Sequence, residues 1–150
     1  MNFKLNKKDS FFSPAEEKRI ISAIKKAEKN TSGEIRVHID ETLGSNPLDR
    51  AKKAFRQMEM HKTRDRNGVL FYISTRDNGF AIWGDVGINK ITPDGFWDEI
   101  KDIVIDLFSK NKRIEGILKG IKMAGDSLKE YFPYIDDVNE LNNEISRKKI

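Results

Sequence analysis

The chain has 150 residues, with 28 basic and 24 acidic side chains, a formal net charge of +4 and no cysteine. This length suits one domain, and the lack of cysteine excludes disulfides, thiolate metal sites and cysteine nucleophiles. The N-terminus lacks the apolar stretch of a secretory signal, and no window approaches the ~20 apolar residues of a membrane span. Basic and acidic residues are interleaved, which argues against nucleic acid as a partner. We therefore expect a cytoplasmic, monomeric protein without a membrane span.

The first predicted element is a helix that follows a polar, frayed segment at residues 1–10. The sequence Ser-Pro-Ala-Glu at 13–16 is a capping box with proline at the first helical position, so the helix begins there and ends near Asn30. Residues 34–40 then alternate between polar and apolar side chains. This alternation predicts a strand with one buried face.

A second helix and two more strands are predicted next. Pro47 opens the helix, and residues 61–68 form a polar loop. The continuous apolar run at 69–74 is typical of a strand covered on both faces. The turn signal Arg-Asp-Asn-Gly at 76–79 predicts a hairpin that leads into a third strand at 80–84.

The last third of the chain is predicted to be helical. One helix is expected to start at Thr92 and Pro93, and another to end before Pro133. Residues 134–150 resemble a weaker amphipathic helix, or a tail packed on the domain, which leaves 11–133 as the domain itself. The order of elements predicts an α/β fold, a three-layer α/β/α sandwich with a small mixed β-sheet and helices on both faces.

Common catalytic motifs are missing from the sequence, including phosphate-binding loops, nucleophile elbows and zinc-binding helices. His38 lies on the polar face of the first strand, where an exposed or hydrogen-bonded side chain is the simplest interpretation. Acidic residues at one end of the predicted sheet, Asp40, Glu41 and Asp77, are expected to be solvated.

Acidic residues also gather at the other end of the predicted sheet. The first two strands should be parallel and the third antiparallel, so the starts of two strands meet the end of the third. Two carboxylates ~4 Å apart repel by about 4 kcal/mol at an effective dielectric near 20, so a cluster needs a cation or basic partners. Oxygen ligands suit Ca²⁺ or Mg²⁺. The predicted metal ligands are Glu34, Asp65, Asn67, Asp85 and Asp94.

Each of these residues also has a purely structural interpretation. Asp65 and Asn67 are common turn formers, Asp94 is a favourable acid in a first helical turn, and Asp85 could hydrogen-bond its own loop. Three nearby basic residues could neutralise the acids as salt bridges: Arg64, Arg66 and Lys90.

Several segments resemble the TPM domain family. They are Asn-Gly-Val-Leu-Phe at 67–71, Phe-Ala-Ile-Trp-Gly-Asp-Val-Gly-Ile at 80–88, the first strand with its preceding Ser-Gly at 32–37, and an aromatic-to-glycine stretch at 108–117. The likeness extends over roughly residues 11–132. It implies a compact α/β/α sandwich.

The resemblance also implies a function. The family includes a thylakoid-lumen protein of photosystem II repair that is reported as an acid phosphatase, and many uncharacterised bacterial proteins, and divalent-cation binding is associated with the fold. A cation-binding domain is thus expected. The alternatives are a metal-assisted phosphomonoester hydrolase with Asp85 as nucleophile or general base, and a protein-interaction module. The sequence departs from many members at Arg66, where they carry an acidic residue.

Overall fold

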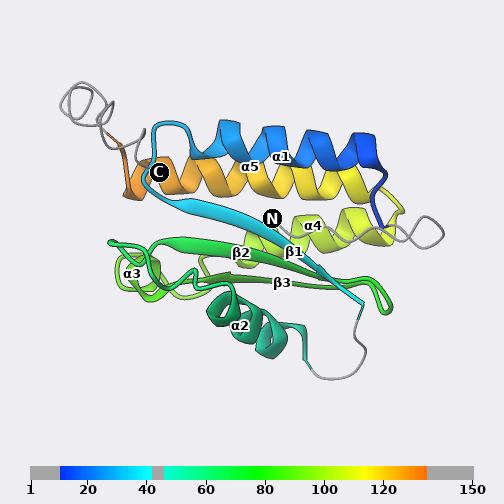
Figure 1. The fold of residues 1–150 in the computed structure, drawn as a ribbon, viewed down its shortest axis with the longest axis horizontal. Coiled ribbons are helices and arrows are strands. Elements are labelled where there is room, and N and C mark those ends of the chain that lie inside the picture. Colours follow the sequence, from blue (N-terminus) through cyan, green and yellow to red (C-terminus); the bar gives the residue numbers. More distant parts are fainter. Residues whose placement is uncertain (1–10, 42–45, 135–150) are drawn as a thin grey trace.

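A small mixed β-sheet lies at the centre of the molecule (Figure 1). The computed structural model describes residues 11–41 and 46–134. The strand order is β1 (Glu34–Asp40), β2 (Gly68–Ser74) and β3 (Gly79–Gly84). β1 and β2 are parallel and β2 and β3 are antiparallel. These are the strand directions that the sequence predicts.

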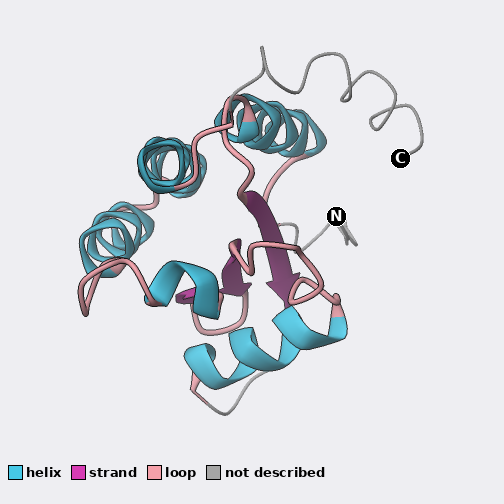
Figure 2. Cartoon of the chain, turned by 90° about the vertical axis from the view of Figure 1, so that its left-hand side faces the viewer, coloured by secondary structure: helices cyan, strands magenta, loops and turns pink. Residues whose placement is uncertain are grey.

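Helices cover both faces of the sheet, as Figure 2 shows in a side view. α2 (Pro47–Gln57) packs against β2 and β3 on one face. On the other face lie α1 (Pro14–Glu28), α4 (Asp98–Ser109) and α5 (Arg113–Tyr131), while the short α3 (Val86–Asn89) follows β3. The predicted three-layer α/β/α sandwich is therefore confirmed.

Two apolar clusters join the layers, and β2 contributes to both. All residues of β2 are buried. Val69, Phe71 and Ile73 face the cluster formed with α1, α4 and α5, whereas Leu70 and Tyr72 face the cluster formed with α2. Because successive side chains of a strand point to opposite faces, a central strand between two helical layers needs an uninterrupted apolar run.

The start of α1 is fixed by the predicted capping box. The Glu16 N–H donates to Ser13 Oγ at 3.1 Å, and the Ser13 N–H donates to Glu16 Oε1 at 2.9 Å. Asn46 caps α2 in a similar way, because its Oδ1 accepts the N–H of Leu48 at 2.8 Å. Both helices therefore begin where local sequence signals place them.

The predicted helix start at Thr92 and Pro93 is wrong. Thr92 Oγ1 donates to the carbonyl oxygen of Ile88 at 2.9 Å and so stays with α3. Gly95 has a φ of +74°, which lies outside the right-handed helical region. Helix α4 begins only after this turn, and the Asp98 N–H donates to the Gly95 carbonyl oxygen at 2.9 Å.

Side chains close part of the free edge of β1. The Ile35 N–H donates to Glu28 Oε2 at 2.7 Å, and Arg36 Nη1 donates to the Ile35 carbonyl oxygen at 2.6 Å. Arg36 Nη1 and Glu28 Oε2 are themselves 2.9 Å apart. An ion pair thus satisfies both outward-facing backbone groups of Ile35.

The segment that follows α1 pairs with the segment that follows α5. Thr31, which follows α1, forms an antiparallel bridge with Pro133, which follows α5. Residues 1–10 and 135–150 lie outside the described ranges. The expected frayed start and the C-terminal helix or tail at 134–150 therefore stay predictions.

Candidate functional site

The three strand ends meet at one end of the sheet, which we call the acidic rim (residues 32–34, 65–67 and 84–85). Glu34 pairs with Gly68, and Val69 pairs with Gly84. The Asp85 N–H donates to the Gly68 carbonyl oxygen at 3.0 Å. The backbone convergence predicted for this end is therefore confirmed.

Asp85 is held by an arginine. Arg66 Nε and Nη2 donate to Asp85 Oδ2 and Oδ1 at 2.7 and 2.9 Å, the bidentate geometry of a strong ion pair. Asp85 Oδ1 also accepts the N–H of Val86 at 2.8 Å, and only 3% of the Asp85 side chain is exposed. The hydrogen bond to Asp85 raises the pKa of Arg66. Asp85 is therefore neutralised by a salt bridge with Arg66, one of the basic residues that the sequence offers as partners for the acids.

Local backbone geometry places Arg66 against Asp85. Arg66 itself has a φ of +50°. Its carbonyl oxygen accepts the N–H of Gly87 at 2.9 Å, and a Cβ at Gly87 would collide with the carbonyl oxygen of Asp65. The loop before β2 thus rests directly on the first turn of α3, and glycine permits this approach.

A second group of polar side chains is centred on Ser32. Ser32 Oγ accepts from Asn67 Nδ2 at 3.0 Å and donates to Asp65 Oδ2 at 3.4 Å. Asn67 is 1% exposed, whereas the Asp65 side chain is 36% exposed and lies 3.3 Å from the solvated Arg64. Ser32 is absent from the predicted ligands. Ser32 lies just before β1 and Asn67 lies just before β2. Because these strands are paired and parallel, the sequence could have indicated that the two residues are neighbours.

Glu34 and Asp94 stand apart from these two groups. The Glu34 carboxylate is 46% exposed and lies 3.6 Å from Arg36 Nη2. Asp94 lines a separate pocket of about 260 Å³, formed by β3 and the segment that precedes α4. Within the described part of the chain, neither carboxylate has a hydrogen bond or ion pair with Asp65 or Asp85.

The acidic rim contains hard oxygen donors, but few of them are carboxylates without an arginine partner. Across residues 11–41 and 46–134, no group of three or more His, Cys, Asp or Glu side chains is arranged to hold a metal ion. Asp65, Asn67 and Ser32 supply a carboxylate, an amide and a hydroxyl group. A cation here would be held by this mixed set, and Asp85 would join only by leaving Arg66.

The opposite end of the sheet holds a polar cluster that the sequence interpretation misses. Tyr72 Oη donates to Asp40 Oδ2 at 2.7 Å, and Arg50 donates to Asp40 Oδ2 at 2.8 Å and to Tyr72 Oη at 2.7 Å. Burial and the bond to Asp40 raise the pKa of Tyr72 to about 12. The expectation that Asp40 is solvated is wrong, because Arg50 of α2 reaches it. The β1–β2 register could have pointed to this cluster, because it places Tyr72 opposite His38 and so next to Asp40 on the same face of the sheet.

Three further residues lie near this cluster. His38 is half-buried and stacks on Tyr72, with ring centroids 5.9 Å apart. Burial lowers the pKa of His38, and its Nδ1 is buried without a hydrogen-bond partner among the described residues. Asp77 Oδ1 accepts the N–H of Gly79 at 3.2 Å and so braces the hairpin turn, while Glu41 is exposed as expected.

Comparisons with known proteins identify relatives of the chain. A family model described as the TPM domain matches residues 5–127. The NMR structure of the BA42 protein, from the psychrophilic bacterium Bizionia argentinensis, is similar over 89% of this chain and 92% of that one, with a TM-score of 0.80 and 41% sequence identity. No curated protein matches the chain.

Two more distant structures share the fold. The N-terminal domain of a protein from P. gingivalis matches with a TM-score of 0.67 at 22% identity, over 81% of this chain and 78% of that one. The N-terminal domain of cg2496 from Corynebacterium glutamicum matches with a TM-score of 0.62 at 15% identity, over 79% and 74% of the two chains. Among the helices that the structure describes, none has the length and apolarity to cross a membrane.

Proposed function

Because this chain belongs to the TPM domain family, we propose that it binds a divalent cation, Ca²⁺ or Mg²⁺, at the acidic rim. The observation that carries the proposal is the meeting of oxygen-bearing side chains from two distant segments, where Ser32 contacts both Asp65 and Asn67. Carboxylate, amide and hydroxyl oxygens are the donors that hard cations prefer.

Arg66 makes the proposed site weak. Its guanidinium group engages both carboxylate oxygens of Asp85. An incoming cation therefore either forgoes that carboxylate or displaces the arginine. Ca²⁺ takes about 6–8 oxygen ligands, and sites with few charged ligands bind it with a Kd of about 10⁻⁴–10⁻³ M. Affinity in this range fits one partly exposed carboxylate, Asp65, whose basic partner Arg64 is solvated, supported by neutral donors.

Titration of ¹⁵N-labelled protein with CaCl₂ and MgCl₂ tests the proposal. Amide shifts are expected at residues 32–34, 65–67 and 85–88, with water completing the coordination. NaCl at the same ionic strength is the control for general screening of charge. A spectrum that stays unchanged at millimolar divalent ion, or changes equally with NaCl, contradicts cation binding.

Substitution of Arg66 gives the sharper test. Arg66→Gln frees Asp85 and removes a positive charge, so the affinity for Ca²⁺ should rise about tenfold, equivalent to about 1.4 kcal/mol. Lys62→Gln is the matched control, since it removes one positive charge from the same loop but from a side chain that is 63% exposed and pairs with Glu59 rather than with a proposed ligand. An equal gain in both variants would mean that only the net charge matters. No gain in either would rule out Asp85 as a potential ligand.

The alternative is a metal-assisted phosphomonoester hydrolase in which Asp85 is nucleophile or general base. The contacts of Asp85 favour binding over this chemistry, because Arg66 and the Val86 N–H engage its oxygens and almost none of its side chain is exposed. Hydrolysis of a phosphomonoester that is lost in Asp85→Asn, with the fold intact, would favour the enzyme. Hydrolysis that persists in this variant removes Asp85 from any catalytic role.

A further inference from the structure

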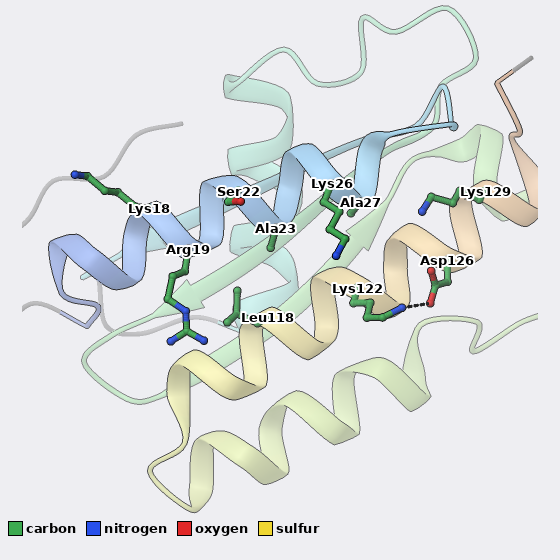
Figure 3. Close-up of a pocket in the computed structure, with 10 residues that line it drawn as sticks. All are labelled: Lys18, Arg19, Ser22, Ala23, Lys26, Ala27, Leu118, Lys122, Asp126 and Lys129. Carbon is green, nitrogen blue, oxygen red and sulfur yellow. Dashed lines mark hydrogen bonds and ion pairs between the residues drawn. The ribbon is translucent and has the colours of Figure 1, made fainter. Parts of the chain in front are cut away.

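A groove runs between α1 and α5, and none of the residues that line it belongs to the acidic rim or the Tyr72 cluster (Figure 3). The two helices lie side by side, and the groove between them has a volume of about 520 Å³. Small-molecule sites typically have volumes of about 300–1,000 Å³. The groove is therefore large enough for a small ligand.

The groove is strongly cationic. Its net positive charge of four equals the formal charge of +4 of the whole chain, so the remaining charges balance one another. Lys122 Nζ lies 3.1 Å from Asp126 Oδ2. The other four basic side chains have no ion pair with any residue that the structure describes. The lining contains one carboxylate, Asp126, and five cations: Lys18, Arg19, Lys26, Lys122 and Lys129.

The floor of the groove is apolar. Ala23, Ala27 and Leu118 form it, and Ala23 and Leu118 are only partly buried, so part of their surface faces the groove. The aliphatic stems of the lysines add apolar walls beneath their charged ends. Burial of the methylene groups of a ligand on such a surface is favourable, because it removes apolar area from water. The floor therefore suits an alkyl chain.

Cations from both helices surround one end of this floor. Lys26 of α1 points across the groove toward α5, where Lys129 lies beside the Lys122–Asp126 pair. Arg19 and Leu118 mark the other end in Figure 3. An acidic group at the Lys26 end would meet ammonium groups from both helices. A chain attached to it would extend along the apolar floor toward Leu118.

We propose that the groove between α1 and α5 binds a single-chain amphiphilic anion, an alkyl chain that carries a carboxylate or phosphate group. The unpaired cations favour a negatively charged ligand, and the apolar floor formed by Ala23, Ala27 and Leu118 favours an alkyl chain. This binding is independent of any cation at the acidic rim, because the two sites share no residue.

An NMR titration of the full chain with dodecanoate, below its micelle concentration, tests the proposal. Shifts are expected at residues 18–27 and 118–129. Dodecyltrimethylammonium, which has the same chain length and the opposite charge, should shift these amides at least tenfold less at equal concentration, and acetate should not shift them. Equal shifts from the cationic amphiphile overturn the proposal, as does binding only to anionic vesicles, which would indicate a membrane surface. Binding only to an acidic peptide overturns it as well.

Charge reversal separates the groove from the general charge of the helices. The double variant Lys26→Glu with Lys129→Glu should weaken dodecanoate binding at least tenfold. Lys25→Glu with Lys119→Glu is the matched control, because these lysines are exposed on the same helices and do not line the groove. Equal weakening in the two double variants contradicts specific binding in the groove.

Discussion

The hydroxyl group of Tyr72 occupies an unusual position, since it lies within the layer between the sheet and α2. It donates to Asp40 and accepts from Arg50, and the tyrosine is 0% exposed. Inside a protein such a hydrogen-bonded chain is strong when complete and costly when one member is missing. The hydroxyl group therefore joins β1, β2 and α2 at one point.

Replacement of Tyr72 by phenylalanine removes this hydroxyl group and keeps the ring. The free energy of unfolding should fall by about 1.5–3 kcal/mol, the range for a hydrogen bond to a charged group. Tyr131→Phe is the control, because that ring packs against Phe96 and not against the Tyr72 cluster, and it should change stability by less than about 0.5 kcal/mol. Urea unfolding measures both, and equal losses would contradict the role assigned to Tyr72.

The same substitution should change the response to high pH. The raised pKa means that folded Tyr72 keeps its proton up to about pH 12, whereas an unfolded tyrosine loses it near pH 10. Between these values the folded state binds more protons, so stability falls as the pH rises. In Tyr72→Phe this loss should be smaller, and the tyrosinate absorbance step near pH 12 should be absent.

At the scale of single residues, the sequence predicts which backbone segments meet better than it predicts which side chains pair with one another. The parallel and antiparallel pairings follow from the crossover and the hairpin, so the meeting of Glu34, Asn67 and Asp85 at one end of the sheet is predictable. The choice of Arg66 as the partner of Asp85 is not. It depends on a φ of +50° at Arg66, and no periodic pattern encodes that angle.

At the scale of elements, Gly125 determines how closely α1 and α5 approach. A Cβ at this position would lie 2.6 Å from the Cβ of Ala27 and 3.0 Å from its carbonyl oxygen. The backbone of α1 cannot yield locally as a flexible side chain can. Gly125→Ala should therefore push the helices apart and lower the free energy of unfolding by about 1–3 kcal/mol, the usual cost of overpacking.

Gly116→Ala is the matched control on the same helix. Its Cβ would lie 3.2 Å from the Cβ of Leu107 and from Cδ1 of Phe108, contacts that a shift of a few tenths of an ångström relieves. The gain in helix propensity, about 1 kcal/mol, should leave the stability of this variant within about 1 kcal/mol of the original. Thermal unfolding compares the two, and a larger loss for Gly116→Ala would contradict the assignment.

Element boundaries show which local signals suffice. Ser13 and Pro14 start α1 as predicted, because the capping bonds lie within one turn of chain. Thr92 and Pro93 carry similar signals, yet the helix begins at Asp98. There the left-handed Gly95 imposes a turn first, and the next residue, Phe96, packs edge-to-face on Tyr131 of α5. Tertiary packing outweighs a cap when the two compete.

At the scale of the whole molecule, the layers follow from hydrophobic patterning. β1 alternates and has one buried face, whereas β2 is buried throughout and lies between two helical layers. These two patterns suffice to predict a mixed sheet with helices on both sides. The groove between α1 and α5 is not predictable in this way, because it depends on the distance between two helices rather than on the face that each one buries.

The ion pair at the edge of β1 has a consequence for many copies of the protein together. A strand with unpaired outward groups can template the addition of another strand, and such addition has no natural end. Glu28→Ala would leave the outward-facing N–H of Ile35 without its acceptor and Arg36 without its ionic partner. We expect concentration-dependent self-association of this variant in sedimentation velocity, while Glu59→Ala, which removes an equivalent charge from a solvated pair with Lys62, should sediment like the original chain.

Sedimentation of Glu28→Ala as a single species at every concentration would contradict this expectation. If the expectation holds, Glu28 and Arg36 act against filament growth, and their contacts matter more to colloidal behaviour than to the stability of one molecule. At high protein concentration this ion pair would then keep the chain monomeric, even if it contributes little to the free energy of unfolding.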